Sequence, residues 1–482
     1  MHPLSSTFSS VARNNRSERR RLFKTHGKHG LVSGRVGVGV EAGVTLPVLD
    51  AMAHALAPDV DLGDCFLVAS MHLLQDSDAV LRKLERWGLD PRNAVVLGKP
   101  YSTNLSVVAC LLDRGYTVHS SSYSMDERLP LGQALEAAAI DALTATVARW
   151  AKAGGRRKIL LVDDGGKLIR VAHDHFRGLV DVFASVEHTS RGIFELESTD
   201  LRMPVVDVAR SWTKRNVEST YIGESVDAHL ERRVGRIDPS KTALVVGYGA
   251  IGKAVAACLR RRGIEVLVHD PALRGGADAP YERLLERADM VFGCSGRTTL
   301  NEAHWPHLKD GVWLVSCSSL DLEFAAWKIR SQPRPPELVV RRDGSDLEHG
   351  SLRGQALFLG DREDPSHYWY CVSLAGRVVH LVNGGCPVNF TGAGVSLPHA
   401  KSDLTVSLLL SGIAQASNEQ RIGLVPLGDE PQRLLMFLHR RAIGLGPDGA
   451  DAGLGAHEGG QHGATEKADP APSHAAVGSA AR

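Results

Sequence analysis

The run Val245-Val-Gly-Tyr-Gly-Ala-Ile-Gly252 restricts the fold of this chain more than any other segment. A short apolar strand over 242–246 leads directly into Gly-x-Gly-x-x-Gly, and a helical pattern begins on the last glycine. In this motif Gly247 permits a tight turn, Gly249 lets backbone amides approach a pyrophosphate, and Gly252 lets helix and strand pack closely. The run therefore predicts a Rossmann unit that binds a dinucleotide through its loop and helix N-terminus, including Tyr248, Ala250 and Ile251.

A second predicted strand, Glu265–His269, ends in Asp270, which lies 18 residues after Gly252. A carboxylate at this point can accept hydrogen bonds from the hydroxyls of the adenosine ribose. The same charge repels a 2′-phosphate, so the expected cofactor is NAD rather than NADP.

Composition excludes several classes of function. The formal charge is +1 over 482 residues, so no overall field points to nucleic acid. No apolar run reaches the roughly 18 residues of a membrane-spanning helix. Seven scattered cysteines without a Cys-x-x-Cys pair argue against disulfides and structural zinc, and favour the cytoplasm. We therefore expect no metal, no nucleic acid and no membrane partner.

Both ends of the chain are expected to be disordered. Residues 1–30 are rich in Ser, Arg and Lys, which predicts a basic leader. Residues 446–482 lack aromatic side chains, and their histidines (457, 462 and 474) have no metal-ligand spacing.

Alternating strands and helices predict an α/β fold with two parallel sheets. Residues 31–215 form the first predicted unit, for the substrate, with strands over 65–69, 93–97, 116–119 and 158–162 and helices over 76–87, 104–114 and 132–153. Residues 216–384 form the predicted NAD unit. Residues 385–445 are predicted to be helical, without a sheet of their own, and to return to the first unit, so that a ligand cleft lies between the two.

Polar clusters follow several predicted strands. Asp163 and Asp164 come directly after the strand 158–162, where carboxylates can serve as acid–base groups or simply cap a helix. A second polar loop, Glu187–Gly192, follows the apolar residues 180–183. Lys214 lies near the predicted boundary, where burial would make it a base and solvent exposure would make it an ordinary surface residue.

These clusters occur in the order of one family. Val162-Asp-Asp-Gly-Gly-Lys167 is similar to the Leu-Asp-Asp-Gly-Gly-Asp of S-adenosyl-L-homocysteine hydrolases (adenosylhomocysteinases). Glu187-His-Thr-Ser-Arg-Gly192 resembles their Glu-Glu-Thr-Thr-Thr-Gly, and Ser211-Trp-Thr-Lys214 resembles Ser-Val-Thr-Lys. The glycine-rich run and Leu381-Val-Asn-Gly-Gly-Cys386 match two further motifs. The resemblance covers about 158–400, and its five blocks together identify a divergent member.

The resemblance implies a split substrate domain, a Rossmann domain holding NAD, and a homo-oligomer. The family oxidises the 3′-hydroxyl of a nucleoside ribose, so that the transient ketone acidifies the 4′ C–H and the 5′ thiolate is eliminated. Water then adds and the ketone is reduced again. The implied site residues are Lys214 beside the 3′-hydroxyl, Glu187 at the ribose, Asp163 or Asp164, Glu218, and, toward the cofactor, Asn383, Thr189 and Ser190.

The chain also departs from the family pattern. Ser319 and Phe390 stand where two family histidines are expected, and the Asp-Asn pair after the lysine becomes Glu218-Ser219. The His-Met-Thr of the adenosine pocket is expected to be replaced near 100–103. Missing acid–base groups of this kind would each lower turnover by about 10²–10⁴-fold on an unchanged substrate.

Three functions follow as hypotheses. The first is an NAD-dependent enzyme that oxidises a nucleoside- or sugar-like hydroxyl, with elimination or hydrolysis, and whose action on S-adenosylhomocysteine itself is doubtful. The second is a catalytically silent NAD-binding regulator. The third, a plain 2-hydroxy-acid dehydrogenase, would need an Arg and a His–carboxylate pair, for which Arg297 and His304 are a poor match.

Overall fold

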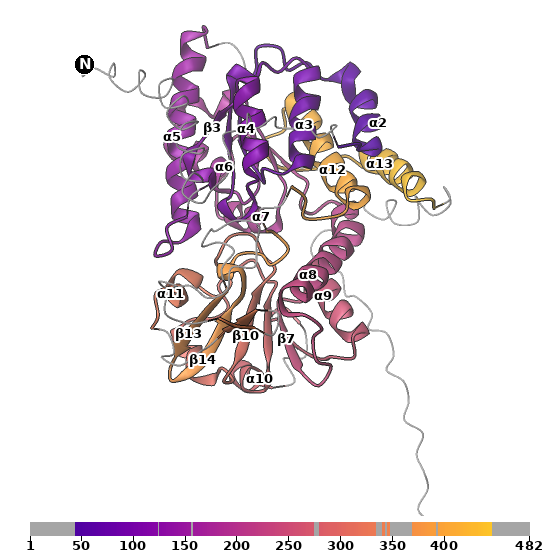
Figure 1. Cartoon of the computed structure of the whole chain (residues 1–482). Coiled ribbons are helices and arrows are strands. Elements are labelled where there is room, and N and C mark those ends of the chain that lie inside the picture. Colours follow the sequence, from indigo (N-terminus) through magenta and orange to yellow (C-terminus); the bar gives the residue numbers. More distant parts are fainter. Residues whose placement is uncertain are drawn as a thin grey trace, which may run out of the picture.

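The computed structural model describes a parallel sheet and a second, mixed sheet, which lie in the upper and lower halves of Figure 1. The described residues are 44–123, 125–155, 158–273, 279–333, 340–342, 345–347, 369–391 and 394–445. The basic leader and the C-terminal tail predicted from the sequence lie outside these residues. The α/β class with a Rossmann-like sheet is confirmed.

The first sheet has seven strands in the order β15-β6-β5-β4-β1-β2-β3, and every neighbouring pair is parallel. Buried aliphatic runs form its centre because both faces are covered. The strands are β1 (Phe66–Ser70), β2 (Ala94–Leu97), β3 (Thr117–Val118), β4 (Ile159–Asp163), β5 (Phe183–Glu187), β6 (Pro204–Asp207) and β15 (Gly423–Pro426).

Helices cover both faces of this sheet (Figure 1). One face packs against α5 (Leu131–Lys152) and α6 (Lys167–His175), with α7 (Ser190–Leu196) at its end. The other packs against α2 (Pro47–Leu56), α3 (Gln75–Arg86), α4 (Leu105–Arg114), α12 (His399–Asn418) and α13 (Asp429–Ala442).

The segment 385–445 returns to the first sheet and has no sheet of its own, but besides the expected helices it contributes one strand, β15, to that sheet. β15 lies between α12 and α13 and pairs with β6 through Leu424↔Val205 and Val425↔Val206. Four residues that end in Pro426 give little strand signal, and such a strand is tolerated because it lies at the sheet edge. We keep the predicted boundaries at 215 and 384 as a proposal.

The second sheet has six strands in the order β13-β14-β10-β9-β7-β8. All pairs are parallel except β13 with β14. The strands are β7 (Thr242–Val246), β8 (Glu265–His269), β9 (Met290–Gly293), β10 (Val312–Ser316), β13 (Tyr370–Leu374) and β14 (Arg377–Leu381). A separate short hairpin joins β11 (Val340–Arg342) to β12 (Ser345–Leu347).

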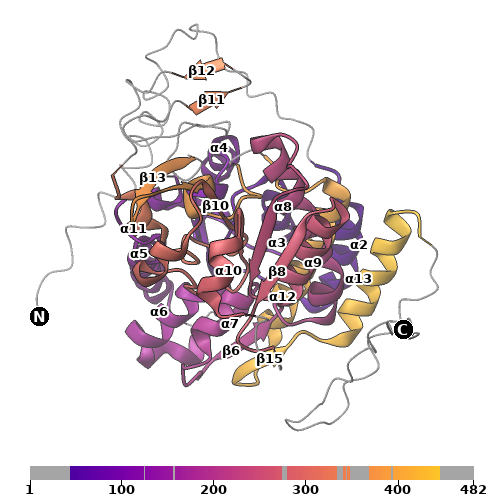
Figure 2. The same ribbon diagram turned by 90° about the horizontal axis from the view of Figure 1, so that it is seen from below.

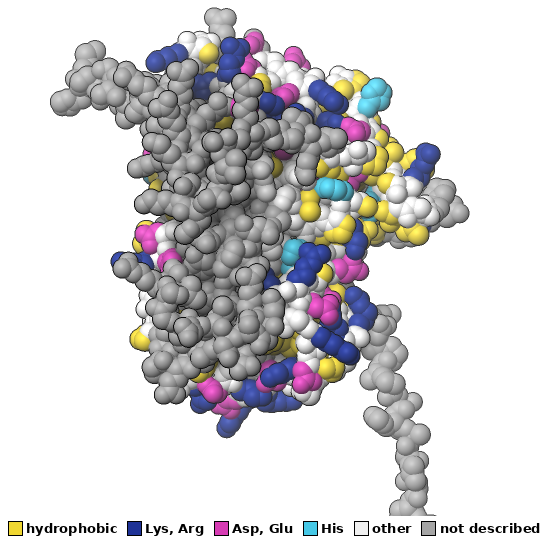
Figure 3. Space-filling view, in the orientation of Figure 1, with side chains coloured by type: hydrophobic (Ala, Val, Ile, Leu, Met, Phe, Trp, Pro, Cys, Tyr) yellow, Lys and Arg dark blue, Asp and Glu magenta, His cyan; other side chains and the backbone are white. Residues whose placement is uncertain are grey.

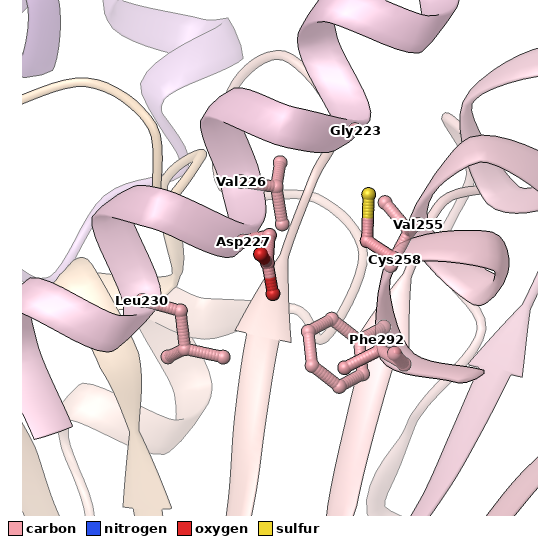
Figure 4. Close-up of a pocket in the computed structure, with 8 residues that line it drawn as sticks. Gly223, Val226, Asp227, Leu230, Val255, Cys258 and Phe292 are labelled. Carbon is pink, nitrogen blue, oxygen red and sulfur yellow. The ribbon is translucent and has the colours of Figure 1, made fainter. Parts of the chain in front are cut away.

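α8 (Ser219–Val234) and α9 (Ala250–Arg261) cover one face of the second sheet, and α10 (Tyr281–Arg287) and α11 (Ala326–Arg330) cover the other (Figure 2). α8 lies close to α9 because Gly223 leaves room: a Cβ there would lie 2.7 Å from the Cβ of Ala254. The small apolar pocket in Figure 4 lies in this helix pair, beside Phe292 of β9. It is a packing gap within the second unit, away from the strand ends.

The described surface carries charges of both signs. Lys and Arg side chains alternate with Asp and Glu over the lower described part of the face in Figure 3. None of the described helices is both long and apolar enough to cross a membrane.

Candidate active site at the facing strand ends

Two loops bring the carboxyl ends of the sheets together. The backbone N–H of Leu320, after β10, donates to Tyr101 Oη, after β2, at 3.3 Å. The N–H of Leu131 at the start of α5 donates to Asp321 Oδ1 at 3.2 Å. An apolar cluster between the units includes Tyr101, Leu131 and Leu320. The strand ends, where ligands of such sheets bind, therefore face one another.

Lys214 lies at this edge, at the start of a π-helical turn, Lys214–Glu218, which leads into α8. Its side chain is 16% exposed, and Nζ lies 2.7 Å from Glu218 Oε2. The same Nζ lies 3.2 Å from Nε2 of His188. Short π-helical segments occur frequently at functional sites. The structure thus joins Lys214 with Glu218, both of which were named as site residues, and adds His188.

His188 is the neutral partner in this group. Burial lowers the pKa of the His188 imidazole well below its usual range, and the charge of Lys214 lowers it further. The ammonium group of Lys214 can only donate, so Nε2 of His188 accepts.

Asp164 is buried between two basic side chains. Its Oδ1 lies 2.6 Å from Lys99 Nζ, and its Oδ2 lies 3.2 Å from His72 Nε2. Burial opposes ionisation of Asp164, but Lys99 and His72 outweigh it, so the pKa of this carboxyl lies well below its usual range. Asp164 therefore stays a carboxylate and does not exchange protons near neutral pH.

Asp163 and Glu187 are paired across β4 and β5 and are fully buried. Burial raises the pKa of Asp163 to about 7, and the nearby Asp164 adds to this. Asp163 Oδ2 accepts from the Ile169 N–H, while Oδ1 has no partner among the described residues. Burial also raises the pKa of Glu187. The several donors at the Glu187 oxygens favour its ionised form.

The structure gives Glu187 a role inside the fold, and its expected place at a ribose stays a prediction. Its carboxylate accepts from the N–H groups of Gly165, Gly166 and Thr189 and from the Thr189 hydroxyl, at 2.7–3.1 Å. It is the last residue of β5 rather than part of a loop, and it points into the fold. His188, the next residue, reaches Lys214 instead.

Thr189 and Ser190 begin α7. The Thr189 hydroxyl caps the helix by accepting from the Gly192 N–H at 3.1 Å, and Ser190 is exposed. α7 lies against the loop after β9, because a Cβ on Gly296 would lie 3.7 Å from the Arg191 side chain. Both residues therefore lie where the two units meet, and their contact with a cofactor remains a prediction.

An aromatic group lines the site. The His72 ring stacks on Phe390 at 4.2 Å between centroids and meets Tyr101 edge-on at 5.9 Å. We expected the histidine of the family's His-Met-Thr motif to be replaced near 100–103. A histidine is nevertheless present at the site, because His72 follows β1. Residues 100–103 contribute Tyr101 and Ser102 beside that histidine rather than replacing it.

The glycine-rich loop of the second unit has the predicted form. Gly247 has φ +90°, and a Cβ on Gly252 would lie 2.0 Å from the carbonyl oxygen of Gly247. α9 begins at Ala250, two residues before the predicted start, with Gly249 as its N-cap and no capping side chain. The first amides of α9, including those of Ala250, Ile251 and Gly252, have no carbonyl partner in their own helix.

Gly249 shows that the loop fits a pyrophosphate. Its φ is −71°, which any residue can adopt, and a Cβ there would meet nothing within 4 Å. Neither backbone geometry nor internal packing thus requires this glycine, whereas close approach of a phosphate does.

Asp270 directly follows β8, beside this loop. Its Oδ2 accepts from the Tyr248 N–H at 2.6 Å, and its Oδ1 accepts from the Ala272 N–H at 2.9 Å. Asp270 thus shapes the loop, and each oxygen retains a lone pair for a ribose hydroxyl.

Asn383 is fully buried with φ +55°; its Nδ2 donates to the Pro387 carbonyl, and its Oδ1 has no partner among the described residues. That free acceptor suits an amide donor such as a carboxamide.

Three charged or basic residues of this site were not expected from the sequence. Lys99 and His72 complete the surroundings of Asp164. Glu323 accepts from the Gly296 N–H and the hydroxyls of Ser295 and Ser318, next to the ends of β9 and β10. A lone Lys or Glu in a loop carries no pattern, although the position of Lys99 just after an apolar strand was a usable signal. Among the described residues, no group of three His, Cys, Asp or Glu could hold a metal.

One protein-family model and several known proteins match this chain. Residues 218–319 match the family model of the D-isomer specific 2-hydroxyacid dehydrogenase NAD binding domain, so the second unit is an NAD-binding domain. The chain is 32% identical over 401 residues to the uncharacterized protein Rv0104 of Mycobacterium tuberculosis, covering 80% of this chain and 72% of that protein.

Two enzymes are more distant relatives. The S-inosyl-L-homocysteine hydrolase of Methanopyrus kandleri is 26% identical over 416 residues, covering 83% of this chain and 88% of that enzyme. The adenosylhomocysteinase of Aeropyrum pernix is 25% identical over 295 residues, covering 58% of this chain and 66% of that enzyme.

Proposed function

We propose, on the premise that this chain belongs to the family of the mycobacterial protein Rv0104 and is a distant homologue of adenosylhomocysteinases, that it is an NAD-dependent enzyme of transient redox chemistry. Its substrate is a nucleoside- or sugar-like molecule, of which one ring hydroxyl is oxidised. Elimination or hydrolysis at a neighbouring carbon follows before the hydroxyl is restored.

The arrangement of Lys214, Glu218 and His188 is the observation that carries this proposal. A partly exposed lysine amine is held by one carboxylate and one neutral imidazole at the edge that faces the NAD unit. A module that only binds NAD has no physical need for this group.

The residues of the second unit fit NAD. The open space at Gly249 and the amides of α9 suit the pyrophosphate, Asp270 suits the adenosine ribose, and the unpaired Oδ1 of Asn383 suits the carboxamide. NAD, when bound, supplies the acceptor for the hydride of the oxidised carbon. The possible homo-oligomer stays part of the proposal.

The chain's own residues would move the protons. Once Lys214 Nζ has released a proton and is a neutral amine, it is placed to take the proton of a substrate hydroxyl, and Glu218 holds the side chain in position. Asp164, which stays ionised, can accept a hydrogen bond from a second hydroxyl. Glu187 instead holds the loop Gly165–Gly166 and the start of α7 in place, and Asp163 holds the first turn of α6.

The proposed class of substrate follows from the positions at which this chain departs from the motifs of the resembled family. Ser319 and Phe390 offer no imidazole where the resembled family has one, while His72 and His188 supply imidazoles from the first unit. Groups facing a sugar are thus better represented than groups facing a thiol leaving group. We therefore do not propose S-adenosylhomocysteine as the substrate.

The test uses the purified full chain. After denaturation, released NAD and NADH are quantified; absorbance of the intact protein near 340 nm is then followed with adenosine, inosine, S-adenosylhomocysteine and a panel of sugars. Reduction of bound NAD by one compound supports the proposal. Bound NAD that no compound reduces would instead support the silent regulator, the second candidate.

A further inference from the structure

Lys99 is a fully buried lysine at the candidate active site. It lies after β2, its side chain is 0% exposed, and its Nζ lies 2.6 Å from Asp164 Oδ1. Lysine is almost never fully buried without a partner, because the loss of hydration is compensated only by a close counter-charge. Lys99 and Asp164 therefore ionise as a pair.

The second oxygen of Asp164 sets the protonation of His72. Asp164 Oδ2 lies 3.2 Å from Nε2 of His72, and Nδ1 of His72 lies 2.5 Å from the Ser102 Oγ. A carboxylate only accepts, so Nε2 carries the proton. In the neutral ring Nδ1 then accepts from the Ser102 hydroxyl, whose other acceptor, the Lys99 carbonyl, is farther away at 3.4 Å.

The surroundings favour the neutral form of that ring. Burial lowers the pKa of His72; the Asp164 carboxylate raises it, and the charges of Lys99 and Lys214 lower it again. His188, which also faces this group, is itself neutral. The rings of Phe390 and Tyr101 take the remaining sides and bring no charge.

We infer that Lys99 is a positioning residue of this site, which satisfies the charge of Asp164 and thereby keeps His72 a neutral imidazole protonated on Nε2. Without Lys99, the buried Asp164 carboxylate would be left with His72 as its nearest cation, so the ring would bind a second proton. With Lys99 present, both ring nitrogens of His72 are engaged and the ring does not exchange protons with a substrate. Lys214 is then the residue that exchanges protons with a substrate, a consequence that rests on the proposed function.

The test measures which nitrogens of the His72 ring are protonated, and it does not require enzymatic turnover. The full chain is labelled with ¹⁵N, the ring signals of His72 are assigned with His72→Gln, and spectra are recorded between pH 6 and 8. The native chain is expected to show one protonated nitrogen, Nε2, throughout. Lys99→Met, of similar length but without charge, is expected to show two protonated nitrogens at pH 6–7.

Two further variants control this result. Lys83→Met removes another buried lysine, paired with Asp50 away from the site, and should leave the His72 signals unchanged. Lys99→Met with Asp164→Asn removes both charges and should return the ring to one proton. An unchanged ring in Lys99→Met would overturn the inference. Should that variant not fold, a proton on Nδ1 or an imidazolium in the native chain would overturn it equally. Neither result depends on whether any compound reduces NAD.

Discussion

The Nε2 atom of His188 lies 3.2 Å from the Nζ atom of Lys214, although the two residues are 26 positions apart. Glu187, the neighbour of His188, points the other way and binds four donors inside the fold. One peptide bond thus separates a residue that supports the backbone from one that reaches Lys214. The resembled family has two successive glutamates here, and this chain keeps the inner one and replaces the outer one.

Lys214→Ala is expected to abolish reduction of bound NAD by the substrate while NAD stays bound. Loss of a general base lowers the rate by about 10²–10⁴-fold, and Lys214 lies outside the glycine-rich loop. The measurement is NAD released on denaturation, together with absorbance near 340 nm. Lys309→Ala, at a surface lysine, serves as the control. Full reduction in the Lys214 variant would remove this residue from the mechanism.

Two glycine variants separate binding from folding. Gly249→Ala should leave the melting temperature unchanged but lower the affinity for NAD at least about tenfold, because its Cβ enters only the open space beside α9. Gly252→Ala should destabilise the fold by about 1–3 kcal/mol, since its Cβ would collide with the Gly247 carbonyl. Thermal unfolding and titration with NAD measure both. Equal changes of melting temperature and of NAD affinity in the two variants would contradict the roles assigned to Gly249 and Gly252.

Glu187→Gln should cost stability, and His188→Gln should cost turnover. Each Glu187 oxygen accepts at least one backbone N–H, and an amide nitrogen cannot accept, so about 1–3 kcal/mol is expected to be lost. His188 is only partly buried, so its variant should unfold like the native chain. Urea unfolding and NAD reduction give the comparison. A native-like midpoint for Glu187→Gln would argue that its carboxylate faces the substrate after all.

Glu323 should make stability depend on pH. Burial raises the pKa of Glu323 from 4.5 to about 7. The folded state then binds a proton that the unfolded state has released, so this contribution is complete below pH 4.5 and is lost as the pH rises through about 7. The loss is up to about 3 kcal/mol.

Glu323→Gln should therefore flatten the decline of stability between pH 5 and 8. Unfolding midpoints in urea at several pH values measure it. Glu302→Gln, at a surface carboxylate bound to Lys328, should keep the native slope. A native slope in the Glu323 variant would show that another group is responsible.

Local rules were sufficient for much of this molecule. The loop of Gly247–Gly252, the helix after it and the apolar strands of both sheets follow from residues close in the chain, because turn geometry and side-chain periodicity are local properties. For the same reason Asp163 and Asp164 could be placed at the end of a strand, whereas Glu187 was expected in a loop and is the last residue of β5. The pairing of Lys214 with Glu218 likewise spans a single helical turn.

Contacts between distant residues required the folded chain. The pairing of β15 with β6, the inward turn of Glu187 and the ion pair of Lys99 with Asp164, 65 positions apart, depend on which surfaces are buried together. The sequence does not tell in which direction the side chain of a carboxylate or a lysine points. The donors and charges that the whole fold places around that side chain decide whether it supports the backbone or faces a ligand.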